Sequence, residues 1–466
     1  MAELEPVIGL EIHVQLKTRT KMFCRCENIW GDDGNTRTCP ICLAHPGTLP
    51  VPNKKAIEWT VKLGVALGCE IAPRALFHRK HYWYPDLPKG YQISQYDVPL
   101  CSAGRFVLPT EEGDRAIGIV RAHLEEDAAK TVHVGGVGGR IAGAEHSLVD
   151  FNRGGTPLVE IVTEPDVRSP EEARRFLQLL RQTVVELGIS DAEMEKGSLR
   201  CDANVSLREP GAEFRTKTEL KNMNSFKFVA DGIAAELARQ RAVYESGGEI
   251  TQETLHYDPA TGRVAPLRSK EYADDYRYFP EPDLVPVEPP QEMIEAARRE
   301  LGELPGARIR LLEAEIGFEL ASGLVTSGRD DLYARVPGDR RVVANVLMNQ
   351  FAASGVDPAN VNAEELGKLI EAREAIPRAA FADALAASGN GEFSADRYLA
   401  EAAISDASEL DPVIERVLGA NEAQVASFKA GKEGVLGYLV GQVMRETGGK
   451  ANPKVVNERL REKLRA

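Results

Sequence analysis

Ionisable and apolar side chains alternate along several segments of the first 290 residues. In residues 7–16, Glu11 and His13 alternate with Leu10 and Ile12. Successive side chains of a strand point to opposite faces, so this pattern predicts a strand with one apolar face and one polar face. The pattern recurs in residues 117–127, 197–208 and 215–223, whose polar members are Arg121, His123, Glu125, Ser198, Arg200, Asp202, Asn204, Ser206, Arg215, Lys217, Glu219 and Lys221.

This polar face has the chemistry of a divalent-metal site beside a phosphate site. Its candidate metal ligands are Glu11, His13, Glu125, Glu126, Glu160 and Asp202. Ligation rich in oxygen favours Mg²⁺ or Mn²⁺ over Zn²⁺. Its candidate phosphate and nucleotide contacts are Ser198, Arg200, Asn204, Lys217, Glu219 and Lys221.

A sheet with one face in water would be a simpler explanation of the alternation. However, a solvated face mostly carries interchangeable Lys, Glu and Thr, whereas this one carries His, Asn, Ser, Arg and paired carboxylates. We therefore predict a metal–nucleotide site. The sequence has neither a G-x-x-x-x-G-K-[ST] loop nor the kinase glycine loop, and the glycines at 135–139 are typical of a hairpin turn. Any ATP would then lie on the sheet face, held through metal ions.

Four of the seven cysteines form two close pairs, Cys24 with Cys26 and Cys39 with Cys42. Two such pairs joined by a short loop can place four thiolates at the corners of a tetrahedron, the geometry of structural zinc. Four thiolates leave no coordination position open for a substrate, so the predicted role is structural. The alternative is four reduced thiols without a metal.

Three helices are predicted between the strands, at residues 53–67, 169–187 and 228–244. The second opens with Ser169 as a cap, a proline and two acids. A proline-rich passage at residues 280–290 then precedes sequence rich in Ala, Leu, Glu and Arg. We expect an α+β protein with three domains: an antiparallel-sheet domain at 1–292, a helical domain at 293–405 and a helical tail domain at 406–466, where Asn452 is expected to cap the last helix.

Composition bounds the function. The 466 residues are 43% hydrophobic and 27% charged, with 57 basic and 71 acidic residues and a formal charge of −14. This is typical of a globular protein, and the absence of a long apolar stretch or a secretory signal predicts a cytoplasmic protein that does not bind a membrane. Residues 429–466 carry nine basic and four acidic side chains. The tail is therefore either a solvated helical face or a surface that binds nucleic acid.

The chain resembles the B subunit of the bacterial tRNA-dependent amidotransferase over almost its whole length. The motifs that carry the resemblance are long and unusual. They are VIGLEIHVQL (7–16), PDLPKGYQISQ (85–95), LEEDAAK (124–130), DFNRGGTPLVEIVTEPD (150–166), GSLRCDANVSLR (197–208), ELKNMNSF (219–226), DYRYFPEPD (275–283), GYLVGQVM (437–444) and ANPKVVNE (451–458).

The resemblance implies one subunit of a heterotrimeric ligase. An amidase-type A subunit would release ammonia from glutamine, and a small C subunit would brace the complex. The substrates would be Glu mischarged on tRNA(Gln), Asp mischarged on tRNA(Asn), or both. The present chain would phosphorylate the side-chain carboxylate with ATP and amidate it. Its first domain would have the glutamine-synthetase-like fold, in which ATP and metals lie on a sheet face. No glutaminase signature is found in the sequence, which fits ammonia from a partner.

The resemblance also implies site residues. The family's Mg²⁺ ligands correspond to Glu11, His13, Glu126 and Glu160, with Glu125 and Asp202 as neighbouring candidates, and its zinc cysteines are all present. Catalysis is assigned to these six acidic and histidine groups together with Arg200. Three tyrosines, Tyr82, Tyr84 and Tyr91, could stack on the aminoacyl end of tRNA or could be core aromatics, and Lys89 and Arg277 could contact phosphate or carboxylate.

Two other functions fit part of the sequence. One is a non-catalytic scaffold that binds tRNA through the zinc segment and the basic tail, with all the chemistry in partner subunits. The other is a free-standing ligase of the glutamine-synthetase type that acts on a small amino acid, against which the basic tail argues.

Overall fold

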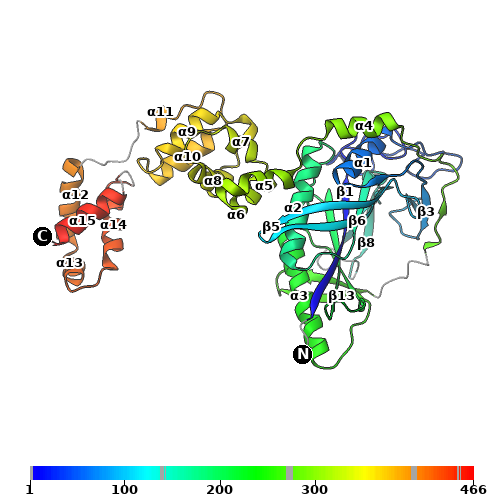
Figure 1. The fold of residues 1–466 in the computed structure, drawn as a ribbon, viewed down its shortest axis with the longest axis horizontal. Coiled ribbons are helices and arrows are strands. Elements are labelled where there is room, and N and C mark those ends of the chain that lie inside the picture. Colours follow the sequence, from blue (N-terminus) through cyan, green and yellow to red (C-terminus); the bar gives the residue numbers. More distant parts are fainter. Residues whose placement is uncertain are drawn as a thin grey trace. The chain divides into compact units, whose positions relative to one another are not determined.

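The chain folds into two compact units, residues 1–308 and 309–466. A computed structural model describes residues 4–136, 141, 143–268, 276–399, 407–448, 451 and 453–465 (Figure 1). Most of the glycine turn at 135–139 and the predicted cap Asn452 lie outside these residues.

The first unit is built around a nine-stranded sheet in the described part of the chain. Its strand order is β13-β12-β11-β10-β1-β9-β6-β5-β2. The strands are β1 (Glu5–Gln15), β2 (Glu70–Ile71), β5 (Cys101–Thr110), β6 (Gly113–Glu126), β9 (Pro157–Thr163), β10 (Leu199–Arg208), β11 (Thr218–Lys221), β12 (Thr254–Asp258) and β13 (Arg263–Arg268).

The alternation seen in the sequence is the alternation of the two sheet faces. In β1 the side chains of Ile8, Leu10, Ile12 and Val14 are buried, and the apolar residues of β10 are buried on the same face. Two long helices, α2 (Pro170–Glu186) and α3 (Phe226–Glu245), cover this apolar face (Figure 1). The polar residues of the same strands therefore share the opposite face.

Contacts of α3 fix which face it covers. Thr218 of β11 donates a hydrogen bond to Glu236 of α3 over 2.7 Å, and Gln240 of α3 donates one to the carbonyl oxygen of Val205. Glu219 and Lys221 lie one and three residues after Thr218 in the same strand. Their side chains therefore point to the opposite face, away from the helix. Helices α1 (Lys54–Ala66) and α4 (Gln291–Glu300) complete this unit, and Asn53, Ser169 and Ser225 cap the starts of α1, α2 and α3.

Two small sheets accompany the large one. β3 (His78–His81) pairs with β4 (Tyr91–Ser94) and with β14 (Phe279–Pro280), and this sheet contacts the end of β6. The other is a hairpin of β7 (Lys130–Val134) and β8 (His146–Asp150).

The large sheet is mixed, whereas the sequence predicted an antiparallel one. β11 and β12 run parallel, and all its other pairs in the described residues are antiparallel. Parallel neighbours need a long crossover connection, and α3 provides it here. The α+β class was therefore predicted correctly, while the all-antiparallel arrangement was wrong for this one pair.

The first unit extends past residue 292, where the first domain was expected to end. Helix α4 packs on α1, and Lys62 forms an ion pair with Glu300 over 3.1 Å. α5 (Pro305–Ile316) follows.

The second unit is helical. It contains α6 (Phe318–Thr326), α7 (Asp330–Arg335), α8 (Arg340–Asn349), α9 (Ala363–Glu371), α10 (Arg378–Ala387), α11 (Asp396–Leu399), α12 (Ala407–Ala420), α13 (Glu422–Lys429), α14 (Val435–Glu446) and α15 (Pro453–Arg465), with short 3₁₀ turns at Phe351–Ser354 and Pro358–Asn360. Buried side chains of α12, α14 and α15 form a hydrophobic cluster of their own. None of the described helices has the length and apolar character needed to cross a membrane.

Two helical glycines of this unit should respond oppositely to alanine. A Cβ on Gly367 of α9 would lie 2.5 Å from the ring of Pro337 and 3.0 Å from its carbonyl oxygen, whereas one on Gly441 of α14 would meet no atom of the described residues within 4 Å. We expect Gly367→Ala to destabilise the unit by about 2 kcal/mol through overpacking. Gly441→Ala should stabilise its helix by up to about 1 kcal/mol. Urea unfolding followed by circular dichroism measures both; a neutral Gly367→Ala would contradict the packing.

Candidate functional site

The register of three neighbouring strands brings the predicted metal ligands together. His13 of β1 is paired with Glu160 of β9, and Glu160 is paired in turn with His123 of β6. Glu11 and Glu125 lie two residues along their strands from these histidines, on the same face. These five residues, Glu11, His13, His123, Glu125 and Glu160, are called the carboxylate–histidine cluster below.

The cluster contains two sets of three ligand atoms close enough to share a metal ion. Glu11, His13 and Glu160 form one set, and His123, Glu125 and Glu160 form the other, with all ligand atoms of a set within 4.8 Å of one another. The Nε2 atom of His13 lies 3.5 Å from Glu160 and 3.6 Å from Glu125, and that of His123 lies 3.6 Å from Glu160. Glu160 is therefore common to both sets.

Burial and charge shift the pKa values of the cluster strongly. Burial, with the nearby Glu160 carboxylate, raises the pKa of Glu125 to about 7. Burial alone would lower the pKa of His13, but hydrogen bonding to Glu160 and the charge of Glu125 raise it to about 9. Burial lowers the pKa of His123 to about 4, which leaves it a neutral imidazole. A metal ion binds deprotonated ligands, so it would compete with the proton on His13.

Cationic residues lie beside the cluster on β10 and β11. Arg200 donates a hydrogen bond to Asp127 over 3.0 Å, and Lys221 pairs with Asp202 and, at 3.4 Å, with Glu219. The buried side-chain oxygen of Asn204, on the same face, has no hydrogen-bond partner among the residues that the structure describes. A polar ligand on the face would satisfy that oxygen, so these residues suit a nucleotide with its phosphates.

Two predicted nucleotide contacts have other surroundings. Ser198 precedes β10, and its hydroxyl group bonds to the backbone of Glu193, so it closes a local turn. Lys217 precedes β11 and is exposed. Glu219 does lie on the face, and it accepts a hydrogen bond from Thr254.

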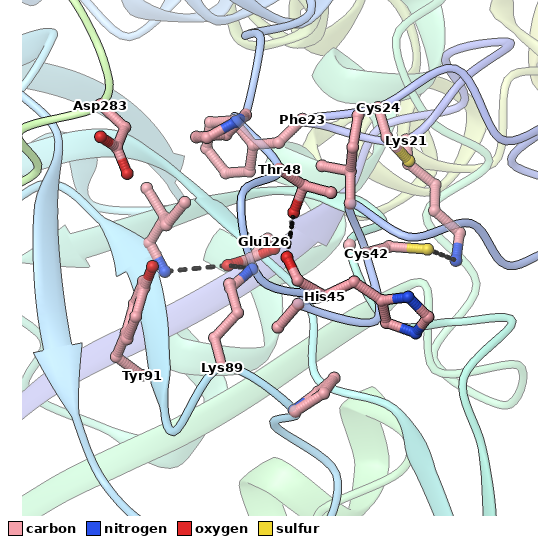
Figure 2. Close-up of a pocket in the computed structure, with 16 residues that line it drawn as sticks. Lys21, Phe23, Cys24, Cys42, His45, Thr48, Lys89, Tyr91, Glu126 and Asp283 are labelled. Carbon is pink, nitrogen blue, oxygen red and sulfur yellow. Dashed lines mark hydrogen bonds and ion pairs between the residues drawn. The ribbon is translucent and has the colours of Figure 1, made fainter.

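Glu126 is placed apart from the cluster, although the resemblance implied a metal ligand there. It follows Glu125 in the strand, and adjacent side chains point to opposite sides. Its carboxylate pairs with Lys89 and accepts a hydrogen bond from the backbone N–H of Ile93 over 3.0 Å. Figure 2 shows Glu126 and Lys89 in a pocket with Tyr91 and Cys42. Glu125 occupies the position in the cluster that was expected for Glu126.

The other aromatic and basic candidates lie around the small sheet of β3, β4 and β14. Tyr82 makes an edge contact with Tyr276, and the guanidinium group of Arg79 lies 4.4 Å from the Tyr91 ring centre. Tyr84 is half exposed, and Arg277 is exposed with a left-handed φ of 44°.

Sequence reasoning left out three residues that the structure places at the site. His123 belongs to the cluster. The available signal was that it shares a strand face with Arg121 and Glu125, since the three residues are spaced by two. Asp127 accepts hydrogen bonds from Gln15 and Arg200. Burial would lower the pKa of Lys80, but Tyr278 and the charges of Glu125 and Glu160 raise it. Asp127 follows Glu125 by two residues and continues the alternation of β6, so the sequence carried a local signal for it. Nothing local connects Lys80 to the cluster, because it lies on β3.

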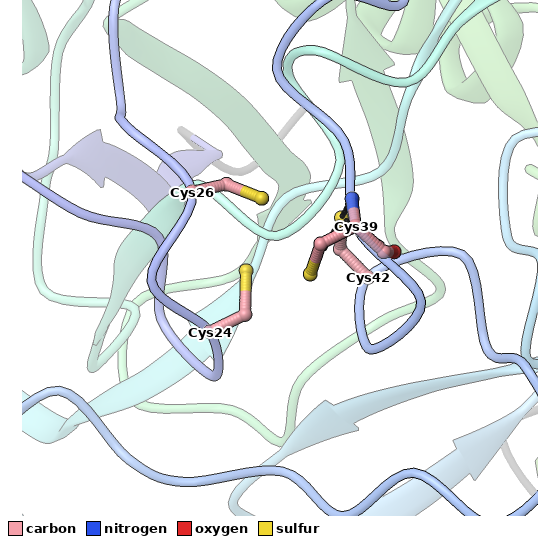
Figure 3. A group of neighbouring side chains, drawn as sticks. All are labelled: Cys24, Cys26, Cys39 and Cys42. Carbon is pink, nitrogen blue, oxygen red and sulfur yellow. Dashed lines mark hydrogen bonds between the residues drawn. The ribbon is translucent and has the colours of Figure 1, made fainter.

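The four predicted cysteines converge. The Sγ atoms of Cys24, Cys26, Cys39 and Cys42 all lie within 4.8 Å of one another (Figure 3). The Cys39 and Cys42 sulfurs are 3.9 Å apart, close to the edge of ~3.8 Å that a tetrahedron with Zn–S bonds of about 2.3 Å requires. Lys21, which is fully buried, has its Nζ atom 3.9 Å from Cys42 Sγ and offsets thiolate charge. The set could bind zinc.

The cysteine segment packs on the chain that leads into β9. The backbone N–H of Arg37 donates a hydrogen bond to Asn152 over 2.7 Å, and the side chain of Asn152 donates one to the carbonyl oxygen of Asp33 over 2.8 Å. Asn35 bonds to Asp150 and Phe151. Residues 150–156 connect the cysteine segment to Glu160, so the segment supports the site without reaching the cluster itself.

The chain is similar to known proteins over almost its whole length. Residues 6–295 match the family model described as the GatB/GatE catalytic domain, and residues 335–464 match the one described as the GatB domain. A protein of Moorella thermoacetica, named as the B subunit of an aspartyl/glutamyl-tRNA(Asn/Gln) amidotransferase, is 47% identical over 99% of this chain and 100% of its own length. A protein of the same name from Carboxydothermus hydrogenoformans is 44% identical over 100% of this chain and 99% of its own length. Another from Syntrophotalea carbinolica is 43% identical over 99% of this chain and 98% of its own length. The cluster lies within the catalytic-domain match, and the chain belongs to the family of B subunits of the tRNA-dependent amidotransferase.

Proposed function

We propose that this chain activates the side-chain carboxylate of Glu on tRNA(Gln), or of Asp on tRNA(Asn), with ATP and then amidates it. The observation that carries the proposal is the carboxylate–histidine cluster beside Arg200 and Lys221 on one sheet face. A glutamine-synthetase-like fold would use such a face in the same way. The name of the Moorella thermoacetica relative, which refers to aspartyl and glutamyl groups on tRNA(Asn) and tRNA(Gln), supports this substrate class.

The chemistry follows from the poor reactivity of a carboxylate towards ammonia, since its leaving group would be oxide. A carboxylate oxygen of the substrate attacks the γ-phosphorus of ATP, the bond from that phosphorus to ADP breaks, and an acyl phosphate forms. The nitrogen of ammonia then attacks the carbonyl carbon. The bond to phosphate breaks, phosphate leaves, and the nitrogen loses a proton to give the amide.

The residues of the face suit these steps. His13, Glu125 and Glu160, with Glu11 and His123, would hold Mg²⁺ or Mn²⁺. Such a metal, when bound, neutralises phosphate charge and stabilises the transition state. Arg200 and Lys221 would donate to phosphate oxygens, and Asn204, whose side-chain oxygen has no partner in the described part of the chain, would offer that oxygen to the nucleotide. Ammonia would come from a glutaminase A subunit, with a small C subunit completing the complex.

The zinc set and the tail have supporting roles in this proposal. Zinc on the four cysteines would fix the segment that packs on residues 150–156. The tail would bind tRNA, although α12 already neutralises part of its charge. Arg459 of α15 pairs with Asp411, and Lys463 pairs with Glu415. The exposed Lys429, Lys432 and Arg445 have no partner among the described residues and are the better candidates for phosphate contacts.

Glu160→Gln tests the activation site. In the complex with its partner subunits, supplied with Glu-tRNA and ATP, this variant should lose amide formation at least about a hundredfold with either glutamine or ammonium as donor. It should also lose Mn²⁺ binding, measured by electron paramagnetic resonance, because both ligand sets share Glu160. Glu126→Gln should keep Mn²⁺ binding, and the exposed Glu213→Gln is the matched control for charge. If Glu160→Gln forms the amide from ammonium at the normal rate, the cluster is not the activation site and the scaffold function gains support.

Metal analysis tests the zinc assignment. The purified chain should contain about one equivalent of zinc, since four thiolates complete one tetrahedral site. Cys39→Ser should lower this content, and Cys201→Ser, a buried cysteine outside the set, should leave it unchanged. A metal-free protein with four additional titratable thiols would contradict the site.

Charge neutralisation tests the tail. Changing Lys429, Lys432 and Arg445 to Gln should weaken tRNA binding and reduce the slope of log K against log salt by about 2–3, because about 0.7–0.9 counterion is released per phosphate contact. This variant leaves the cluster of α12, α14 and α15 intact, whereas deletion of residues 429–466 would remove two of its helices. Filter binding at several salt concentrations measures the slope, and an unchanged slope would exclude these three residues from the tRNA contact.

A further inference from the structure

The loop from Tyr82 to Gly90, which joins β3 to β4, is anchored beside the carboxylate–histidine cluster. Near its end, Lys89 pairs with Glu126 of β6. In its middle, the carbonyl oxygen of Asp86 accepts a hydrogen bond from the backbone N–H of Ala129 over 3.1 Å. At its start, Tyr82 lies within electrostatic reach of Glu125. The loop is therefore held at the end of β6, where Glu125 enters the cluster.

Trp83 is the most exposed large hydrophobic side chain among the described residues, with 88% of its surface accessible. Its six-membered ring lies against Gly90, where a Cβ would sit 3.1 Å from the ring. Gly90 has a φ of +72°, a left-handed backbone conformation that favours glycine. The missing side chain of glycine also leaves room for the indole ring. Tyr84, one residue away, is 51% exposed. A large indole is thus presented to solvent by an anchored loop instead of being buried.

Such a ring needs a partner of matching chemistry. Unpaired nucleobases stack on exposed aromatic side chains without requiring a particular base, and single-stranded nucleic acid is commonly bound in this way. The substrate of the proposed reaction is an amino acid attached to the unpaired 3′ end of a tRNA. When the side-chain carboxylate of this amino acid reaches the cluster, the nucleotides at the 3′ end of the tRNA must lie on the protein surface close to the cluster.

Resting on the proposed function, we propose that Trp83 is a stacking platform for an unpaired nucleobase near the 3′ end of the aminoacyl-tRNA. Trp83 positions the substrate and takes no part in the chemistry. The adenine of ATP is a poorer occupant, because the candidate phosphate contact Lys221 lies on β11. This strand is separated by β10, β1 and β9 from β6, to which the loop is anchored.

Binding to an RNA minihelix tests the platform without turnover. The probe is an acceptor-stem minihelix with its unpaired 3′ nucleotides, compared with the same minihelix trimmed to the last base pair, and the protein is the intact complex. Trp83→Ala should weaken binding of the complete minihelix about tenfold, as expected for the loss of one stacked base, and leave the trimmed one unaffected. Trp83→Phe should restore most of the affinity because it keeps an aromatic face.

A second exposed tryptophan provides the matched control. Trp30 is 64% exposed, and Lys130 lies 5.8 Å from its ring centre. Trp30→Ala should bind both minihelices like the wild type. The complete minihelix should also quench tryptophan emission of the wild type, and Trp83→Phe should lose this quenching although it still binds.

Steady-state kinetics separates positioning from chemistry. Trp83→Ala should raise the KM for Glu-tRNA with kcat and the KM for ATP unchanged. Three results would overturn the proposal: unchanged minihelix affinity, a raised KM for ATP, or loss of a partner subunit on purification, which would make Trp83 an interface residue. Minihelix affinity is independent of amide formation. Failure of the platform is therefore distinguishable from failure of the activation site, which Glu160→Gln tests.

Discussion

The pairing of β9 between β1 and β6 is the constraint on which the site depends. Glu160 faces His13 on one side and His123 on the other, so a single carboxylate belongs to both possible ligand sets. A shift of β9 by one residue would turn Glu160 to the apolar face beneath α2 and α3. The buried aliphatic residues Val159 and Ile161 prevent this shift, because it would expose them on the polar face. The hydrophobic core thus fixes the geometry of a polar site.

Local pattern in the sequence predicted several strands of the large sheet and their two faces, because the alternation of apolar and polar residues in a strand can be seen in consecutive residues. It predicted β1, β6 and β10 with nearly correct bounds, and it placed Glu11, His13, Glu125 and Asp202 on one face. The capping residue Ser169 gave the start of α2 for a similar reason, since it acts on its own helix.

Features that depend on contacts distant in sequence were harder to predict. The strand order and the parallel pair of β11 and β12 follow from how α3 crosses the sheet, which no short pattern records. Glu126 was carried over as a metal ligand from a motif, while the pleat of β6 directs it to Lys89. Lys80 approaches the cluster only through the packing of another strand, β3.

The hydrogen bonds between the cysteine segment and residues 150–156 also set an order of events during synthesis. Asn35 and Phe151, which are bonded in the folded chain, are 116 residues apart. At a synthesis rate of 5–20 residues per second, the segment that carries the four thiols leaves the ribosome roughly 6–23 seconds before its support. The nascent chain therefore presents these thiols without their packed surroundings for that interval, and the segment reaches its final form only after β8 and the start of β9 have been made.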